Sequence, residues 1–443
     1  MNKILFYIKK LIPKSIFESF QPAYHYLMAW FGNLKYGFPS RKIKVVGITG
    51  TKGKTTTAEL VSAILEEAGH KTAIISTLRF KIGKETRPNL LKMTMPGRMF
   101  IPKMLREAVN AGCDYAVVEM TSEGSKQFRH RFIEMDALIF TNISPEHIES
   151  HGSYEKYLLA KLNIAKALEN SKKKNKTLIV NAEDKEADKF LMIKGVKKIR
   201  YTLADAKPFT LNKDWSHLKI DGESVITKLV GEFNVYNILA AITFAKNEGI
   251  SFSDIKSALE KFDGVAGRME KVEIDLEKLK DENGNSLGLL GKFPPFTTII
   301  DYAHTVDSLE KVYKVFKDHK KICVLGSAGG GRDKWKRPLM GGTAKMYCDK
   351  IILTNEDPYD ENPRAIVEEV AKGITDKEYK IIMDRREAIR EAFEMAERDN
   401  VVLITGKGTD PFIMGANGDN QEWSDRKVAE EELTKIALKK FRK

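Results

Sequence analysis

GITGTKGKTTTAEL, residues Gly47 to Leu60, is the stretch of sequence that decides the fold of this chain. The apolar residues Ile43, Val45 and Val46 precede it and a helical pattern follows it, so we expect a strand, a glycine loop and a helix. In that geometry, backbone N–H groups and the positive end of the helix dipole converge on an anion. The segment therefore predicts a binding site for a nucleoside triphosphate.

Two residues of this loop add chemistry to it. Lys54 supplies a mobile positive charge for phosphates, and the hydroxyl of Thr55 can ligate Mg²⁺. The spacing departs from the strict P-loop pattern G-x-x-x-x-G-K-[ST], because Ile48 stands five residues before Gly53. A tight strand-to-helix turn that binds no ligand is the weaker alternative interpretation.

Short apolar runs alternate with helical stretches from residue 42 to about residue 267, a pattern typical of a parallel α/β sheet. The expected strands are Thr72–Ser76, Tyr115–Glu119, Ala137–Thr141 and Thr177–Asn181, separated by helices such as Ile101–Asn110 and Tyr154–Glu169. A second α/β unit follows, with expected strands Thr297–Asp301, Ile322–Leu325, Lys350–Thr354, Tyr379–Met383 and Val401–Thr405. Between the two, the Asn-Gly of the sequence DENGNS predicts a hairpin turn inside an insertion.

The length of 443 residues suggests two to four domains. We expect a short helical and basic leader at 1–40, a central P-loop-type parallel-sheet ATPase domain at 41–267, and a Rossmann-like α/β C-terminal domain at 268–443. Fewer than about 45 residues precede the nucleotide strand, below the roughly 50 that a domain needs. The leader is therefore expected to be a truncated N-terminal region.

The composition is ordinary for a globular chain, with 42% hydrophobic and 30% charged residues, but the formal net charge is +13. Residues 1–44 carry eight Lys or Arg against the single acid Glu18, and a second basic cluster closes the chain. No zinc-finger, RRM-like or basic heptad pattern accompanies this charge. A basic surface that favours anionic substrates is preferred over a dedicated nucleic-acid site.

Cys113, Cys323 and Cys348 have neither the spacing of a disulfide framework nor that of a zinc site, so we expect buried small hydrophobes in a reducing compartment. No apolar run reaches the roughly 18 to 20 residues of a membrane span, and Met1–Ile12 is too short for a secretory signal. These features predict a cytoplasmic protein, and we expect a monomer.

The leader contains two apolar pieces. Ile4, Leu5, Ile8, Leu11 and Ile12 recur at helical spacing, with Lys9 and Lys10 on the other side, and an aromatic-rich piece runs from Tyr24 to Phe31. Packing of both pieces against the main body is the favoured interpretation. A peripheral contact of residues 1–12 with an anionic membrane stays open as the alternative.

Polar residues follow the expected strands, at the edge where ligands collect in a parallel sheet. Glu119 stands at the end of one strand, from which a carboxylate could reach a Mg²⁺ held by Thr55. His147 and His151 are four residues apart, but their surroundings favour a loop. A pair of histidines like this is more often a satisfied structural feature than a metal site.

ITGTKGKTTT, EMTSEGSKQFR and TNISPEHIESHGSYEKYLLAK, in this order and at these spacings, resemble the Mur ligase family, most closely the branch that adds the third residue to a UDP-N-acetylmuramoyl-dipeptide. Further matches are GEFNVYN (231–237), GRME (267–270), DYAHTVDSLE (301–310), GRDKWKRPLMG (331–341), DRREAI (384–389), GKGTD (406–410) and WSDRKVAEEEL (423–433). The resemblance covers about residues 41–435. An ordered set of motifs is far more specific than any one of them.

The resemblance implies an ATP-dependent ligase that joins an amine to a carboxylate through an acyl phosphate, with two Mg²⁺ ions. It implies catalytic roles for Lys54, Glu119, His147 and Lys161, with metal ions near Thr55, Glu119, His147 and a carbamylated Lys161. The nucleotide contacts that it implies are Gly50, Thr51, Lys52, Gly53, Lys54, Thr55, Thr56, Asn234, Asn237, Arg268, Asp301 and His304. The substrate contacts are Thr94, Pro96, Ser122 and Arg129 in the central domain, and Asp357, Tyr359, Lys407 and Asp410 in the C-terminal domain. Its partners would be a nucleotide-linked muramoyl peptide and an amino acid, with no specific nucleic acid.

The chain departs from the family pattern at three places that bear on the substrate. The D-N-P-R of the diaminopimelate-adding enzymes reads Glu356-Asp357-Pro358-Tyr359, and a tyrosine cannot form the bidentate pair that an arginine forms with a carboxylate. G-K-G-H-E becomes GKGTD at 406–410, and S-S-H becomes TSE at 121–123. The amino acid added could be diaminopimelate, lysine or another.

Two other functions remain as alternatives. A folylpolyglutamate-synthetase-like ligase also begins near its nucleotide loop, but GKTTT and DYAHTVDSLE are Mur-like and disfavour it. A non-catalytic nucleotide-binding partner protein is disfavoured because the set of catalytic and metal-site residues is intact. The first hypothesis is an amide-bond ligase that extends a cell-wall peptide.

Overall fold

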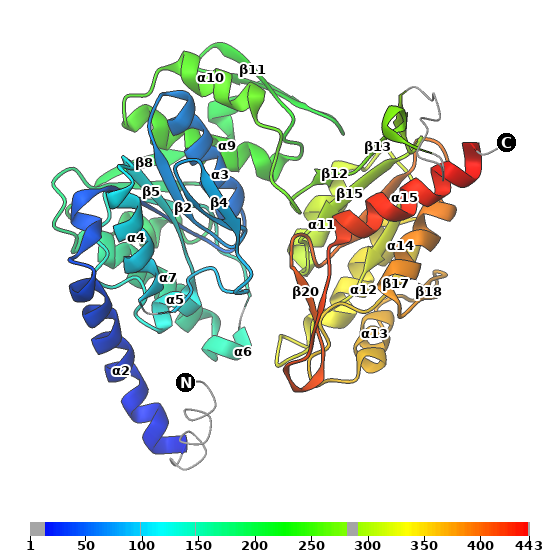
Figure 1. The fold of residues 1–443 in the computed structure, drawn as a ribbon, viewed down its shortest axis with the longest axis horizontal. Helices are drawn as coiled ribbons and strands as arrows, with labels where there is room; N and C mark the ends of the chain where they lie inside the picture. Colours follow the sequence, from blue (N-terminus) through cyan, green and yellow to red (C-terminus); the bar gives the residue numbers. More distant parts are fainter. Residues whose placement is uncertain (1–13, 98, 147, 281–290, 442–443) are drawn as a thin grey trace. The chain divides into compact units, whose positions relative to one another are not determined.

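The computed structural model describes residues 14–97, 99–146, 148–280 and 291–441, with side chains from residue 20 onward (Figure 1). The chain forms two compact units. Unit 1 comprises Met1–Pro208, Leu218–Val225 and Asn234–Phe262, and unit 2 comprises Phe209–His217, Ile226–Phe233 and Asp263–Lys443. The domain boundaries predicted at residues 40 and 267 stay predictions.

Unit 1 is built on an eight-stranded sheet with the order β4-β3-β2-β5-β1-β6-β7-β8. The strands are β1 (Lys44–Thr49), β2 (Thr72–Ile75), β3 (Arg79–Ile82), β4 (Glu85–Pro88), β5 (Tyr115–Met120), β6 (Ala137–Phe140), β7 (Thr177–Asn181) and β8 (Lys197–Tyr201). β1 is central, because Val46 pairs in parallel with Val117 of β5 and with Ala137 of β6. β3 and β4 are antiparallel additions at one edge. The predicted α/β fold with a parallel core is confirmed.

The helices of the first part of the chain are α2 (Lys14–Lys35), α3 (Lys54–Glu67), α4 (Phe100–Asn110), α5 (Ser122–Lys126), α6 (Ile148–His151), α7 (Tyr154–Glu169), α8 (Ala187–Leu191), α9 (Glu232–Asn247) and α10 (Phe252–Lys261), with 3₁₀ turns at Pro39–Lys42 and Leu203–Ala206. α4 and α7 bury Leu105 and Ile164 in a core with the strand residues Val45 and Leu138. α3 packs against β2, β5 and α10. The start of α3 is thereby fixed at the carboxyl end of β1.

Unit 2 holds a six-stranded sheet with the order β12-β15-β19-β16-β17-β18. Its strands are β12 (Glu270–Lys271), β15 (Thr297–Asp301), β16 (Lys321–Leu325), β17 (Lys350–Leu353), β18 (Lys380–Ile381) and β19 (Val401–Thr405), and its helices are α11 (Val306–Val315), α12 (Lys336–Tyr347), α13 (Pro363–Ala371), α14 (Arg385–Glu394) and α15 (Asp425–Phe441). Ile299 faces the core formed with α11, α12 and α13, whereas Ile300 faces the core formed with α14 and α15. Burial on both faces explains why these strands read as continuous apolar runs.

Smaller elements complete the chain. β9 (Phe209–Leu211), β10 (Ser216–Ile220) and β11 (Glu223–Thr227) form a three-stranded sheet, and β13 (Ile274–Asp275) with β14 (Lys292–Phe293) and β20 (Phe412–Met414) with β21 (Asn420–Glu422) form two antiparallel pairs. Two 3₁₀ turns lie at Leu276–Lys278 and Ala416–Gly418. The hairpin turn predicted in DENGNS lies outside the described residues. Within the part of the chain that is described, no helix is long and apolar enough to cross a membrane.

The structure corrects the expectation for two of the cysteines. Cys323 of β16 and Cys348, which directly follows α12, are buried as expected but form a disulfide with a Cα–Cα distance of 6.1 Å. The crossover from β16 through α12 to β17 brings together two residues that are 25 positions apart. Their spacing in sequence gives no sign of this pairing, and only Cys113 remains a free buried thiol.

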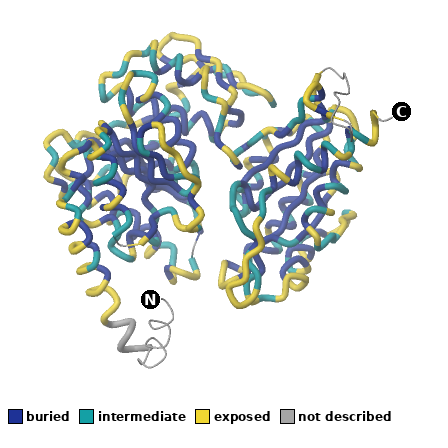
Figure 2. Tube along the Cα trace, in the orientation of Figure 1, coloured by how far each residue is buried: buried dark blue, intermediate teal, exposed yellow. Residues whose placement is uncertain are grey.

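The expected packing of the aromatic piece Tyr24–Phe31 is confirmed for one face of the helix only. α2 buries His25 and Ala29, while Tyr24, Leu27 and Phe31 are exposed. Figure 2 shows the described part of α2 largely in the colour of exposed residues. The first amphipathic piece, residues 1–12, lies outside the described residues.

Candidate functional site

The nucleotide loop runs from the end of β1 to the start of α3, and two of its positions require glycine. Gly53 caps α3 in the left-handed region at φ +83°, and a Cβ there would lie 2.2 Å from Asn237 Oδ1. Gly50 has φ +152°, and a Cβ there would lie 1.9 Å from Thr141 Oγ1. Only glycine combines this backbone freedom with the absence of a side chain. The loop glycines are thus explained by close packing.

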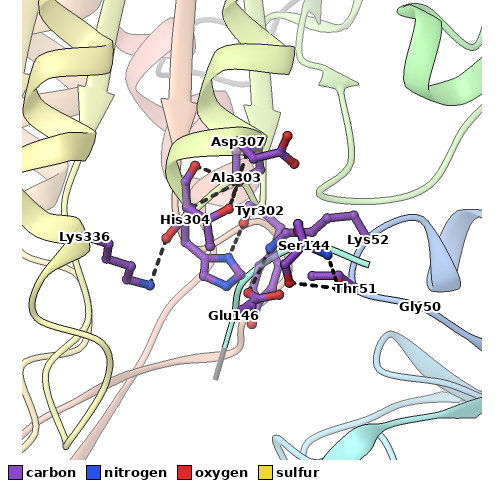
Figure 3. A network of polar contacts seen from close by, with 12 residues as sticks. Gly50, Thr51, Lys52, Ser144, Glu146, Tyr302, Ala303, His304, Asp307 and Lys336 are labelled. Carbon is purple, nitrogen blue, oxygen red and sulfur yellow. Dashed lines mark hydrogen bonds and ion pairs between the residues drawn. The ribbon is translucent and has the colours of Figure 1, made fainter. Parts of the chain in front are cut away.

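The segment that follows β6 holds the loop in shape. The Thr51 N–H donates to the Asn142 carbonyl at 2.8 Å, and the Lys52 N–H donates to Asn142 Oδ1 at 3.0 Å. Ser144 N–H donates to Thr51 Oγ1 at 3.0 Å, and Lys52 Nζ pairs with Glu146 at 2.9 Å, as Figure 3 shows. The loop is therefore preformed by contacts within unit 1.

Two lysines converge on the first residue of the loop. Lys54 Nζ donates to the carbonyl oxygens of Gly50 and Thr51, both at 2.9 Å, and Lys161 Nζ donates to the Gly50 carbonyl at 2.7 Å. Lys161 is only 1% exposed, and its Nζ lies 4.9 Å from the centre of the Tyr157 ring. Burial, with Lys54 nearby, holds the pKa of Lys161 well below its usual value. Lys161 is thus a buried amine at the loop rather than a solvated helix lysine.

Glu119, near the end of β5, is a buried carboxylate beside the start of α3. The Thr77 N–H and hydroxyl donate to its two oxygens at 3.1 and 3.0 Å. Burial raises the pKa of the Glu119 carboxyl, against the opposing effects of Lys54 and of the Thr55 hydroxyl. The structure thus brings together Lys54, Thr55 and Glu119 at the carboxyl edge of the sheet, as the sequence predicted.

The asparagines predicted to contact the nucleotide lie on α9, next to the first turn of α3. Asn237 Nδ2 donates to Asn234 Oδ1 at 3.0 Å, and the Thr57 hydroxyl donates to Asn237 Oδ1 at 3.4 Å. Thr56 is buried in the same turn of α3. These amides therefore belong to the wall around the glycine loop.

The predicted substrate residues of unit 1 form a second group. The Arg129 guanidinium donates to the Met95 carbonyl, between Thr94 and Pro96, and to Gln127 Oε1. The Thr94 hydroxyl bonds that of Thr77 at 2.7 Å, which links this segment to Glu119. Arg129 is therefore joined to the segment predicted to contact the substrate.

Ser122 is buried at the start of α5, with its hydroxyl 3.2 Å from His151 Nε2. His151 also pairs with Glu123 at 3.1 Å. The sequence favoured a loop here, but Ile148–His151 forms the short helix α6, which buries His151. His147 lies outside the described residues.

Unit 2 gathers its predicted nucleotide residues at the end of β15. Asp301 accepts hydrogen bonds from the N–H groups of Met269 and Ala303 at 2.8 and 2.7 Å. The Arg268 guanidinium lies 4.3 Å from the centre of the Tyr302 ring. His304 Nδ1 is 2.6 Å from the Tyr302 carbonyl and its own carbonyl accepts from Lys336, contacts drawn in Figure 3. Arg268, Asp301 and His304 therefore form one cluster.

Lys407 links the predicted substrate residues of the C-terminal domain. Its buried Nζ bonds Asp357 at 2.7 Å, Asp410 at 3.3 Å and the Phe412 carbonyl at 2.5 Å. The Tyr359 N–H donates to the Met414 carbonyl, with Tyr359 held at φ +50°. The four predicted residues are therefore held by one polar network around β20.

Two further residues of this network were missed. Glu356 is buried, its Oε2 accepts no hydrogen bond from the described residues, and burial, with Asp357 nearby, raises the pKa of its carboxyl. The exposed Arg332 donates a hydrogen bond to Tyr359. Glu356 lies in the motif EDPY and Arg332 lies in the motif GRDKWKRPLMG. A charged side chain inside a motif already noted in the sequence was the signal that could have identified each of them as a site residue.

Among the described residues, no group of three or more His, Cys, Asp or Glu could hold a metal ion. This does not test the predicted metal site, since Thr55 and a modified lysine are other ligand types. A buried carboxylate beside a hydroxyl, as at Glu119 and Thr55, is an oxygen donor set that suits Mg²⁺. The residues present therefore fit the ion that the sequence predicts.

A glycine loop between a parallel strand and a helix, with a lysine, a hydroxyl and a buried carboxylate at its edge, defines a nucleotide-binding α/β enzyme. The Mur ligase middle domain matches residues 48–245, and the domain described as "Mur ligase, glutamate ligase domain" matches residues 288–408. The chain belongs to the Mur ligase family, and it is an ATP-dependent ligase that forms C–N bonds.

Relatives and solved structures agree with this assignment. The chain is 36% identical over 413 residues to UDP-N-acetylmuramoyl-L-alanyl-D-glutamate--2,6-diaminopimelate ligase of Syntrophomonas wolfei. This match covers 90% of this chain and 80% of the relative. A solved structure of a ligase of that name matches with a TM-score of 0.58 at 26% identity, over 89% of this chain and 79% of the other. The folylpolyglutamate synthase of Mycobacterium tuberculosis shares the fold, with a TM-score of 0.65 at 14% identity over 94% and 95% of the two chains.

Proposed function

We propose that this ligase adds a diamino acid of the diaminopimelate type to a UDP-N-acetylmuramoyl-dipeptide, in the synthesis of a peptidoglycan precursor. The observation that carries this proposal is the similarity, at 36% identity over 90% of the chain, to a ligase named for that reaction. The acceptor carboxylate attacks the γ-phosphate of ATP, ADP leaves, and the amine of the donor then displaces phosphate from the acyl phosphate.

The glycine loop is the proposed phosphate site of this reaction. The N–H groups of Gly50 to Thr56 and the ammonium of Lys54 offset the negative charge that two approaching anions create. Lys54 now bonds two loop carbonyls, which a phosphate oxygen would replace as its partners. Asn234 and Asn237 in unit 1, and the cluster of Arg268, Asp301 and His304 in unit 2, are the other proposed nucleotide contacts.

Thr55 and Glu119 would hold a Mg²⁺ ion, and His147 is a further proposed ligand. When bound, Mg²⁺ neutralises phosphate charge and so lowers the barrier to attack by a carboxylate. Thr77 orients the Glu119 carboxylate through two hydrogen bonds, one from its N–H and one from its hydroxyl. Thr77 is therefore a positioning residue, which the sequence did not suggest.

Lys161 is the proposed site of carbamylation. An amine reacts with CO₂ only when it is unprotonated, because the nitrogen lone pair forms the N–C bond and a proton is released. Burial at the nucleotide loop favours the unprotonated amine. The resulting carbamate is an anion, and it would orient the second predicted Mg²⁺ where a protonated lysine would repel it.

Recognition of the donor amino acid is assigned to the network around Lys407. Tyr359 stands at the position of the arginine in D-N-P-R, but the guanidinium of Arg332 bonds Tyr359. Arg332 can form the bidentate pair with a carboxylate that a tyrosine cannot form. Asp357 and Asp410, both bonded to Lys407, are the proposed partners of a donor ammonium.

The test is an assay of phosphate release and product mass with purified protein, ATP and Mg²⁺. UDP-N-acetylmuramoyl-dipeptide is offered with diaminopimelate, lysine or ornithine, and a folate is offered with glutamate. Release that requires the muramoyl dipeptide, with a product heavier by one diaminopimelate residue, is the expected result. Release with folate and glutamate alone would replace this proposal by the folylpolyglutamate alternative. A cytoplasmic location stays a prediction.

A further inference from the structure

α2 has two faces of opposite character. One face is buried and carries His25, Ala29 and Asn33, which are spaced four residues apart. The opposite face carries five large apolar side chains at alternating spacings of four and three residues, each between 46% and 70% exposed. These five form the apolar stripe of α2: Phe20, Tyr24, Leu27, Phe31 and Leu34.

The stripe lies on a helix that is anchored to its unit. The Arg106 guanidinium of α4 donates to the Tyr36 carbonyl at 2.8 Å, just beyond the end of α2. The Tyr26 ring packs against the rings of Phe128 and Phe132 at centroid distances of 5.9 and 5.2 Å. In the part of the chain that is described, nothing covers the stripe, and Figures 1 and 2 show α2 extending out of unit 1. Five aligned apolar side chains in water indicate a binding surface.

The composition of α2 and the charge around it indicate what binds there. Tyr24 lies in the stripe and Trp30 flanks it, and such residues favour the boundary between water and lipid. Residues 1–44 contain eight Lys or Arg and one acid. Lys35 is an exposed cation at the carboxyl end of the helix, and the exposed Arg41 beyond it lies 3.8 Å from Glu134. This charge is complementary to anionic lipid head groups.

We propose that α2 is a peripheral membrane anchor, whose apolar stripe inserts into the head-group region of an anionic bilayer. The helix lies along the membrane surface, with the buried face of His25, Ala29 and Asn33 toward its own unit. Pairing of two copies through the stripe is disfavoured, because it would bring two strongly basic segments together without acidic partners. The anchor is distinct from the ligase reaction and does not depend on the identity of its substrate.

Flotation of the full-length protein with vesicles tests the proposal. Binding is compared between phosphatidylcholine vesicles and vesicles containing equal parts of phosphatidylcholine and phosphatidylglycerol, at low and high salt. The test variant is Leu27→Glu with Phe31→Glu. The matched control, Met192→Glu with Met346→Glu, places the same charge at two other apolar side chains, each 73% exposed.

We expect the wild type and the control to bind the anionic vesicles, with binding weakened by salt. The stripe variant should bind at least about 100-fold more weakly, since two apolar side chains no longer leave water. Its thermal midpoint and its ATP-dependent phosphate release should match those of the control, which separates loss of binding from misfolding. Equal binding of both variants, or equal binding to neutral and anionic vesicles, would overturn the proposal.

Sedimentation velocity without lipid gives the other decisive outcome. The proposal expects the wild type and the stripe variant to sediment alike as monomers. A dimer that only the stripe variant abolishes would instead make α2 an interface between two copies of the chain. Brominated lipids that quench the wild type but not a Trp30→Phe variant would place the helix at the head groups.

Discussion

Lys161 of α7 donates a hydrogen bond from Nζ to the carbonyl oxygen of Gly50 across 2.7 Å, although the two residues are 111 positions apart in sequence. Lys54 donates to the same oxygen at 2.9 Å. Two ammonium groups cannot share this site without strong repulsion, and burial also disfavours a charged Lys161. Burial and the neighbouring Lys54 thus hold the pKa of Lys161 well below its usual value, which favours the unprotonated amine that carbamylation needs.

Replacing Lys161 by alanine should remove most ligase activity, by a factor of about 100 or more, since the carbamate is proposed to act in phosphoryl transfer. Formate or acetate should restore part of it by supplying an anion in the vacated space. Lys156→Ala removes an exposed lysine from the same helix and should leave the rate within about twofold. Phosphate release in the presence of both substrates measures these effects, and an undiminished rate in Lys161→Ala would remove the carbamate proposal.

Gly53→Ala should lower nucleotide binding and stability more than Gly69→Ala does, although both residues have a positive φ, +83° and +86°. The backbone cost of about 1–2 kcal/mol is common to both variants. An alanine at 53 would in addition press against Asn237, whereas nothing lies within 4 Å of a Cβ at 69. We expect a lower free energy of unfolding for both variants, with the larger loss for Gly53→Ala, and weaker nucleotide binding by calorimetry for Gly53→Ala only. Equal behaviour of the two variants would contradict the packing of the loop against α9.

Many strands of the fold could be predicted from the short apolar runs, because a strand that is buried on both faces consists almost entirely of apolar residues. β7, β15, β19 and α7 have the bounds that the sequence predicts. The contacts between distant elements could not be predicted in this way. Nothing in YLLAK itself indicates that Lys161 is buried, and its role came only from the family resemblance. The Cys323–Cys348 disulfide is also a contact between distant elements, and the sequence did not show it. The aromatic-rich piece Tyr24–Phe31 was expected to pack against the main body, but most of its large apolar side chains are exposed.

Joining Cys323 to Cys348 should stabilise unit 2, because the bond restricts a loop of 25 residues in the unfolded chain. The double variant Cys323→Ala/Cys348→Ala should lose about 3 kcal/mol of unfolding free energy in urea. Thiol titration of the denatured wild type should find one thiol, that of Cys113, and three after reduction. Three thiols without reductant would contradict the pairing.

The Glu123–His151 pair should make stability depend on pH. The hydrogen bond from His151, together with that from Ser150, lowers the pKa of Glu123 to about 2. A carboxyl whose pKa is lower in the folded state than in the unfolded state stabilises the protein at pH values above its unfolded-state pKa, which is about 4.3. This stabilisation is lost as the pH falls toward 2. Because Glu123 is partly exposed, we expect this effect to contribute about 1 kcal/mol or less to the free energy of unfolding. Glu123→Gln should be less stable than the wild type at pH 7, with a gap that narrows below pH 4; a gap that is constant with pH would contradict this account.

The central claim is that ATP activates the carboxylate of the acceptor as an acyl phosphate, and oxygen tracing tests it most directly. The muramoyl dipeptide is labelled with ¹⁸O in its reacting carboxylate, and the phosphate released during ligation is analysed by mass spectrometry. The account predicts one ¹⁸O in each phosphate, because the attacking oxygen leaves with phosphorus when the amine displaces it. Unlabelled phosphate, accompanied by the full yield of amide product, would contradict it.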